Sequence, residues 1–135
     1  MSLDLQQREH EGVTILDMTG RMTAGPEATA FRDKIAALTA AGTRNVVLNL
    51  AHVDYIDSTG LGALVMSATS LRRHDGAVKL LKLTRRSIQL LVMTKLATVF
   101  EIFNDEQDAV NSFYPDRKIK TFDILDFVQK MKDED

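Results

Sequence analysis

Two adjacent hydroxyl side chains, Ser58 and Thr59, lie where the sequence points most directly to chemistry. An apolar run at 46–50 predicts a buried strand before them, and a helical period of apolar residues begins at Leu61 after them. The hydroxyls therefore fall at a helix N-terminus, where free backbone N–H groups and the helix dipole favour an anion. Two interpretations stay open: a hydroxyl that caps the helix, or an acceptor whose phosphate the helix end would hold.

The residues around this pair favour a surface that another chain approaches. The segment consists of Asp57, Ser58, Thr59, Gly60, Leu61 and Gly62. Two glycines in the first turn of a helix cost roughly 1 kcal/mol each relative to alanine. We therefore expect this turn to be left bare so that another backbone can come close.

A serine hydrolase is the competing enzyme interpretation, and its other requirements are not met. Ser58 would need a base, usually histidine, and no glycine precedes it in the pattern Gly-x-Ser-x-Gly. His10, His52 and His74 fall at turns or ends of elements, without the spacing of metal ligands. The sequence has no cysteine, no G-x-G-x-x-G and no Walker-type lysine. We therefore predict a protein that is not an enzyme, with no catalytic residue, no metal and no cofactor.

The composition is that of an ordinary globular protein of 135 residues, which predicts one domain. Lys and Arg number 17 against 19 Asp and Glu, so the formal net charge is −2 and we expect no direct contact with nucleic acid. The longest apolar stretches are 61–66 and 90–93. A membrane-spanning helix needs about 20 residues. Because the N-terminus also lacks the features of a signal peptide, we expect a cytoplasmic protein without membrane insertion.

The periodicity of the whole chain indicates how the hydroxyl pair is positioned. The expected strands are 3–7, 13–18, 46–50, 77–83 and 98–103, and the expected helices are 27–41, 61–74, 85–96 and 106–113. Residues 53–56 are expected to form a connector. This order predicts a single α/β domain over residues 1–114, with a mixed sheet, central parallel strands, an N-terminal hairpin and helices mainly on one face.

Residues 115–135 are predicted to form a linker and a short helix outside this domain. Thr121 can cap an amphipathic helix that runs through residue 131. Its apolar face consists of Ile124, Phe127, Val128 and Met131. That face either docks on its own domain or packs on another chain, which would allow a homodimer through the helix.

The run 47–50, followed by 55–62, resembles the STAS domain of bacterial anti-sigma factor antagonists, whose pattern is an apolar strand followed by D-S-[ST]-G-L-G. The resemblance extends from about residue 5 to residue 113. It implies a STAS-like fold and a regulatory role by partner switching: the unphosphorylated protein binds an anti-sigma factor that is also a serine kinase. The kinase phosphorylates the serine that matches Ser58. We therefore expect Ser58 to be the phosphate acceptor, and Thr59 is the second candidate. A metal-dependent serine phosphatase restores binding.

The resemblance also implies which residues contact the partner. They are Asp57, Thr59, Gly60, Leu61 and Gly62. Many antagonists carry an acidic residue three positions after the glycine that ends the second strand, and here that position is Thr23, which changes the expected kinase contact. The alternative is a STAS scaffold or adaptor, for example in a lipid-transport or signalling complex, in which Ser58 serves only as an N-cap.

Overall fold

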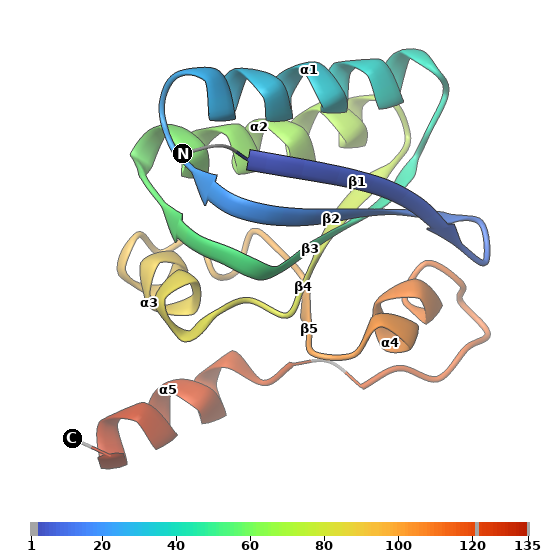
Figure 1. Cartoon of the computed structure of the whole chain (residues 1–135). Coiled ribbons are helices and arrows are strands. Elements are labelled where there is room, and N and C mark those ends of the chain that lie inside the picture. Colours follow the sequence, from blue (N-terminus) through green and yellow to red (C-terminus); the bar gives the residue numbers. More distant parts are fainter. Residues whose placement is uncertain (1–2, 121, 135) are drawn as a thin grey trace.

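The computed structural model describes residues 3–120 and 122–134, in which strands and helices alternate after an N-terminal hairpin (Figure 1). The strands are β1 (Leu3–His10), β2 (Val13–Met22), β3 (Asn45–Ile56), β4 (Ala77–Leu81) and β5 (Ile102–Phe103). The helices are α1 (Pro26–Ala40), α2 (Ser58–Arg73), α3 (Arg85–Met93), α4 (Glu106–Asn111) and α5 (Ile124–Glu134).

The strands form one mixed sheet in the order β1-β2-β3-β4-β5. β1 and β2 are an antiparallel hairpin, whereas β2, β3, β4 and β5 run parallel. Parallel neighbours need a crossover connection, and α1, α2 and α3 lie in these connections. The predicted α/β class and mixed sheet are confirmed.

The helices cover the two faces of the sheet unequally. α1 and α2 lie side by side over one face (Figure 1). The larger apolar cluster joins the sheet to α1, α2 and α3, with Phe31, Leu64 and Leu91 at most 2% exposed. A smaller cluster joins the other side of the sheet to α4, through Val47, Phe103 and their neighbours. Full burial of each such side chain contributes roughly 1.5–3 kcal/mol, so the larger cluster provides most of the stabilising contact.

The strands differ in length from the sequence-based expectation: β1, β2 and β3 are longer, and β4 and β5 are shorter. β3 continues to Ile56, where the pattern predicts a connector, because Val53 and Ile56 are buried in the core. Register shifts between β2 and β3 let their pairing continue this far. β5 has only two residues, because the chain before it turns, with a bond of 3.0 Å from Val99 N to Leu96 O. The longer β3 carries the chain directly into α2.

The tail contacts the domain of its own chain. Phe122 N donates a hydrogen bond to Ile102 O at 3.1 Å. The tail side chains that pack against the larger apolar cluster are Phe122, Ile124 and Phe127. Asp123 Oδ1 accepts from Asp126 N (3.0 Å) at the start of α5, and Thr121, the expected cap, lies outside the described residues. The domain boundary at residue 114 and a homodimer through α5 stay predictions.

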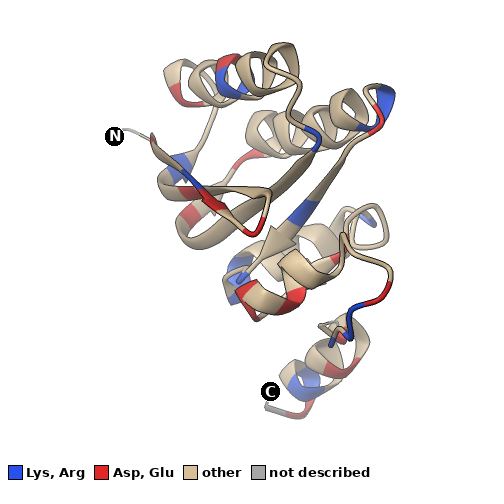
Figure 2. Cartoon of the chain, turned by 90° about the vertical axis from the view of Figure 1, so that its right-hand side faces the viewer, with Lys and Arg blue, Asp and Glu red and all other residues tan. Residues whose placement is uncertain are grey.

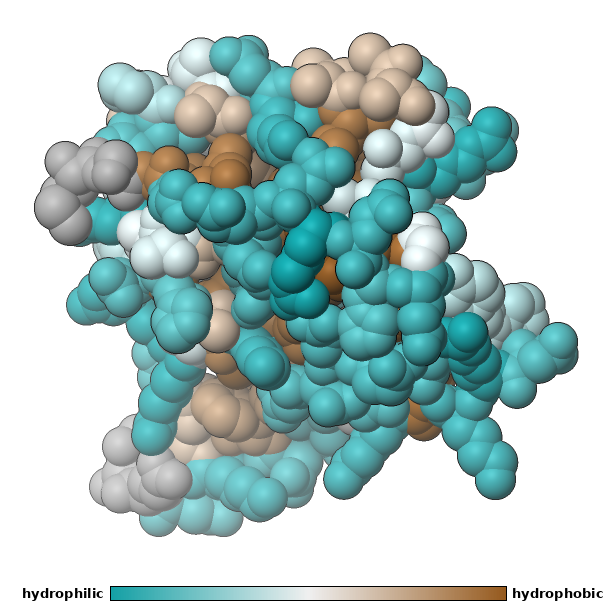
Figure 3. Space-filling view, turned by 45° about the vertical axis from the view of Figure 1, so that its right-hand side comes forward, coloured by the Kyte–Doolittle hydropathy of each residue, from teal (hydrophilic) through white to brown (hydrophobic). Residues whose placement is uncertain are grey.

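The outer surface carries both signs of charge on the same elements. Figure 2 shows acidic and basic residues together on α1 and on α5. The face in Figure 3 is largely hydrophilic, with apolar atoms at the top, where α1 and α2 lie. Such interspersed charge is typical of globular proteins.

Candidate functional site

Ser58 is the first residue of α2, directly after β3. Its side chain is exposed, and none of the residues in 3–120 and 122–134 forms a hydrogen bond with its hydroxyl. The N-cap of α2 is Asp57, so the interpretation of Ser58 or Thr59 as the cap is wrong. The Ser58 hydroxyl is therefore open to solvent and is not needed to hold the helix.

Asp57 joins three segments at this junction. Its Oδ1 accepts from Gly60 N at 2.8 Å in the first turn of α2, and its Oδ2 accepts from Ala24 N at 2.9 Å in the loop before α1. Its own N–H donates to Met22 O at the end of β2, at 3.1 Å. Hydrogen bonds from the Gly60 and Ala24 N–H groups lower the pKa of the Asp57 carboxyl, so the side chain stays ionised at neutral pH.

The loop between β2 and α1 is thereby held against the start of α2. Ala24 and Asp57 are 33 residues apart in the chain, yet their contact places Thr23 beside the junction. Thr23 is half-buried, and its carbonyl accepts from Ala28 N at 3.1 Å, in the first turn of α1. The structure thus brings Thr23 together with the 57–62 segment.

The two glycines of the first turn have different surroundings. A Cβ on Gly60 would lie 2.1 Å from the Met22 carbonyl oxygen, so only glycine lets α2 pack this closely on the end of β2. A Cβ on Gly62 would meet nothing within 4 Å. The expectation that both glycines leave room for another chain is wrong for Gly60, whose neighbour belongs to the same chain. For Gly62 it stays a prediction.

The remaining segment residues differ in how much surface they offer. Leu61 is 6% exposed and belongs to the larger apolar cluster, so it anchors α2 from inside. Thr59 is half-buried, whereas Ser58 and Gly62 are exposed. Within residues 58–62, a partner would therefore meet mainly Ser58 and Gly62.

Ser58 borders an open groove between the start of α2 and α3. The groove has a volume of about 290 Å³. Its lining includes Tyr55, Ser58, Arg86, Leu90 and Met93. The Tyr55 ring contacts two guanidinium groups, with centroid distances of 5.1 Å to Arg21 Cζ and 5.7 Å to Arg86 Cζ. Sequence reasoning missed this groove, because it joins elements that no local motif connects.

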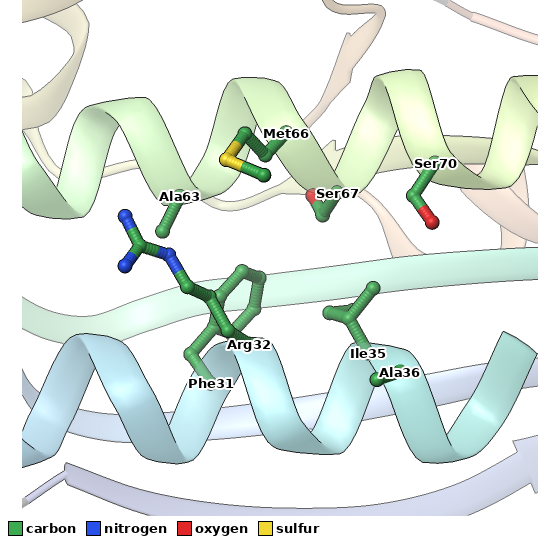
Figure 4. A pocket seen from close by; sticks show the side chains of 8 residues that line it. All are labelled: Phe31, Arg32, Ile35, Ala36, Ala63, Met66, Ser67 and Ser70. Atoms are coloured by element: carbon green, nitrogen blue, oxygen red, sulfur yellow. The ribbon is translucent and has the colours of Figure 1, made fainter.

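A second hollow, of about 190 Å³, lies between α1 and α2 (Figure 4). Phe31 and Ile35 of α1 and Ala63 and Met66 of α2 line it, and Met66 is 60% exposed. Ser58 does not belong to its lining, so the two hollows are separate features.

The histidines do not line the groove of Ser58. His10 in β1 contacts Glu106 and Gln107 at α4, and His52 and His74 are exposed. Across the described ranges, no group of three or more His, Asp or Glu side chains is arranged to hold a metal ion. None of the helices within these ranges has the length and apolar character needed to cross a membrane.

A cluster of charged side chains, not anticipated from the sequence, joins β1, β2 and α4. Arg8 Nε lies 2.6 Å from Asp17 Oδ2, and Arg8 Nη1 lies 2.8 Å from Glu106 Oε2. Hydrogen bonds from Arg8 lower the pKa of Asp17 and lower that of Glu106 to about 2. The register of the hairpin, which pairs Arg8 with Ile15 and Gln6 with Asp17, brings Arg8 close to Asp17, and the position of α4 adds Glu106.

Known proteins are similar to this chain over most of its length, including the 57–62 segment. Residues 4–109 match the family model described as the STAS domain. The anti-sigma-B factor antagonist of Listeria monocytogenes is 32% identical over 108 residues, which cover 78% of this chain and 91% of that protein.

Two solved structures share the fold. An anti-sigma factor antagonist from Mycobacterium paratuberculosis gives a TM-score of 0.72 at 21% identity, covering 82% of this chain and 92% of that one. The Bacillus cell fate determinant SpoIIAA in its phosphorylated form gives a TM-score of 0.64 at 16% identity, covering 82% and 99%.

Proposed function

Because this chain belongs to the STAS domain family, we propose that it is an anti-sigma factor antagonist that acts by partner switching. It binds an anti-sigma factor while Ser58 is unmodified, and phosphorylation of Ser58 ends the binding. The anti-sigma factor is itself the serine kinase, and a metal-dependent serine phosphatase returns the chain to its binding form. The chain is a regulatory protein and carries out no reaction of its own.

The observation that carries this proposal is the free, exposed hydroxyl of Ser58. Because Asp57 provides the cap of α2, a phosphate on Ser58 breaks no hydrogen bond among the residues that the structure describes. An acceptor must also enter the active site of a kinase, which a residue at the start of a helix beside an open groove can do. In the scaffold interpretation Ser58 serves only as the N-cap of α2, but the N-cap in the structure is Asp57.

The proposed partner-binding surface surrounds this hydroxyl. Gly62 and the outer side of Thr59 flank it on α2, and the loop of Thr23 is held beside it by Asp57. Gly60 and Leu61 support the surface from below, through close packing on β2 and burial in the core. With threonine at position 23, the kinase contact is a hydrogen bond or an apolar contact instead of an ion pair.

The experiment that tests the proposal compares the two forms of the chain against one partner. The purified chain is incubated with ATP and each anti-sigma factor encoded in the same genome, and phosphate is located by mass spectrometry. Both forms are then titrated into that anti-sigma factor by calorimetry. We expect binding by the unmodified form alone. A chain that acquires no phosphate, or that binds equally in both forms, would leave only the scaffold role.

A further inference from the structure

Arg86 borders the same groove as Ser58, from the side of α3. Its guanidinium carbon lies 5.7 Å from the centroid of Tyr55, and no carboxylate in the described part of the chain forms an ion pair with it. The Arg86 side chain is exposed, so it can move without losing buried contacts. A long, exposed cation thus shares a groove with the proposed phosphate acceptor.

The immediate neighbour of Ser58 is an anion. Asp57 is held ionised by the two backbone N–H groups that it accepts from, at 2.8 and 2.9 Å. A phosphate on Ser58 would add about −1.5 to −2 charges one residue away. Like charges at such short range disfavour the doubly charged phosphate unless a cation compensates them.

Two charged residues line the groove, Asp57 before α2 and Arg86 of α3. Arg21 of β2 contacts the ring of Tyr55, which also lines it, and Asp54 and Arg85 are sequence neighbours of lining residues. Of the two arginines on Tyr55, only Arg86 lines the groove together with Ser58. The guanidinium fork can bind two phosphate oxygens at once. For an exposed arginine, a phosphate is therefore a stronger partner than the face of an aromatic ring.

We propose that Arg86 is the internal counter-cation of the phosphate on Ser58: its guanidinium leaves the Tyr55 ring and binds the phosphate across the groove. This assignment rests on the proposed phosphorylation of Ser58. The modification then changes the surface twice, since it adds an anion at the start of α2 and removes a free cation from α3. A partner whose carboxylate forms an ion pair with Arg86 loses that contact in the phosphorylated form.

The test measures the second ionisation of the phosphate directly. Phosphoserine is installed at position 58 of the full chain by codon suppression, and its pKa is read from the ³¹P shift against pH. Arg86→Gln should raise this pKa by about 0.2–0.7 unit, because one exposed ion pair is lost. Arg86→Lys keeps the charge and should show a smaller rise. Arg73→Gln, at the far end of α2, is the control and should leave the pKa unchanged.

Several results would overturn the assignment. The phosphate pKa could be the same in Arg86→Gln as in the chain that keeps Arg86, the control could rise equally, or Arg21→Gln alone could raise it. Circular dichroism of each variant shows that the fold is intact. Because the phosphate is installed without a kinase, a chain that no kinase modifies would contradict the proposed function and leave this measurement valid.

Discussion

Asp57 and Ser58 are adjacent residues with separate tasks. Asp57 is bonded on both carboxylate oxygens, to the first turn of α2 and to the loop before α1. Ser58 is exposed and forms no such bond within the described residues. The carboxylate therefore holds the junction together, and a change at the hydroxyl would not disturb the start of the helix.

The neighbouring hydroxyl of Thr59 allows a sharp test of which residue is the acceptor. We expect Ser58→Ala to abolish incorporation of phosphate by the cognate kinase and Thr59→Ala to keep most of it, because Thr59 is half-buried and Ser58 is exposed. Intact-mass spectrometry after incubation with ATP measures both. Full incorporation into Ser58→Ala would transfer the role to Thr59.

The two glycines of the site form a matched pair for a stability measurement. In Gly60→Ala the new methyl would lie 2.1 Å from the Met22 carbonyl oxygen, so α2 must shift away from β2. We expect a loss of about 1–3 kcal/mol in the free energy of unfolding. In Gly62→Ala the methyl meets nothing, and removing a helix glycine should add up to about 1 kcal/mol. Urea unfolding of both variants measures the difference.

Partner binding by Gly60→Ala and Gly62→Ala distinguishes a glycine that is needed for packing inside the chain from one that a partner contacts. If a partner covers Gly62, the added methyl of Gly62→Ala weakens association although the fold is as stable as before. An equal loss of stability in both variants would mean that the close approach of α2 to β2 is not what requires glycine at position 60.

At the scale of elements, the Arg8 cluster attaches α4 to the hairpin. Because Arg8 lowers the pKa of Glu106 from 4.5 to about 2, the folded state binds fewer protons than the unfolded chain in this range. The stabilisation is complete above about pH 5 and is lost as the pH falls toward 2. Asp17, whose pKa Arg8 also lowers, adds in the same direction.

We therefore expect Glu106→Gln to lower the free energy of unfolding at neutral pH by about 1 kcal/mol, the upper value for partly exposed pairs. The difference from the wild type should shrink between about pH 5 and pH 3. Urea unfolding at several pH values measures it, with Glu9→Gln, an exposed change on β1, as the control. A difference that stays constant down to pH 3 would show that Glu106 acts through packing and not through its charge.

α5 offers a second test at this scale. Phe127 packs on the larger apolar cluster and contacts the Phe122 ring at 5.5 Å, whereas Leu125 on the same helix is 79% exposed. Phe127→Ala should cost about 1–2 kcal/mol, since the side chain is half-buried, and should lower the melting temperature. Leu125→Ala should leave the melting temperature unchanged.

The oligomeric state of these variants tests a homodimer through the exposed face of α5, which carries Leu125 and differs from the apolar face expected from the sequence. If the exposed face with Leu125 joins two chains, Leu125→Ala shifts the mass measured by light scattering toward the monomer. If Phe127→Ala leaves the melting temperature unchanged, docking of α5 on its own domain contributes no stability.

The sequence predicts the elements well where the signal is local. Thr84 precedes a helical period and is a good cap by type, and its Oγ1 accepts from Ser87 N at 3.2 Å at the start of α3. The end of β3 is less predictable, because it depends on the pairing with β2 and on the burial of Val53 and Ile56 in the core. A two-residue strand such as β5 has no period to detect.

The site shows the same division between local and tertiary signals. The 57–62 segment can be recognised from the sequence because its residues are consecutive. The sequence places its cap one or two residues too late, since Asp57, Ser58 and Thr59 are all good caps and only the structure selects one. The close contact of Gly60 with Met22, and the position of Arg86 in the groove, depend on tertiary packing that no spacing reveals.

For the whole molecule, the proposed switch requires little change of fold. A phosphate on Ser58 meets the positive end of α2, an interaction that contributes roughly 0.3–1 kcal/mol near a surface. The domain should therefore be unharmed or slightly stabilised. Amide NMR spectra of the two forms should differ mainly at residues 54–66 and along α3, which borders the same groove. Widespread changes in β1 or α4 would contradict a local mechanism.

The large effect belongs to the partner surface. A partner shaped for the Ser58 hydroxyl and the bare Gly62 must bury a dianion that the single charge of Arg86 does not fully compensate, and an uncompensated charge in such a contact costs on the order of 2–5 kcal/mol. At about 1.4 kcal/mol per tenfold change, phosphorylation should weaken binding roughly 30- to several thousand-fold. Ser58→Asp carries one charge on a shorter side chain, so titration should show a loss of the same sign and smaller size. Equal affinity of the modified and unmodified chains would mean that the partner does not close over Ser58.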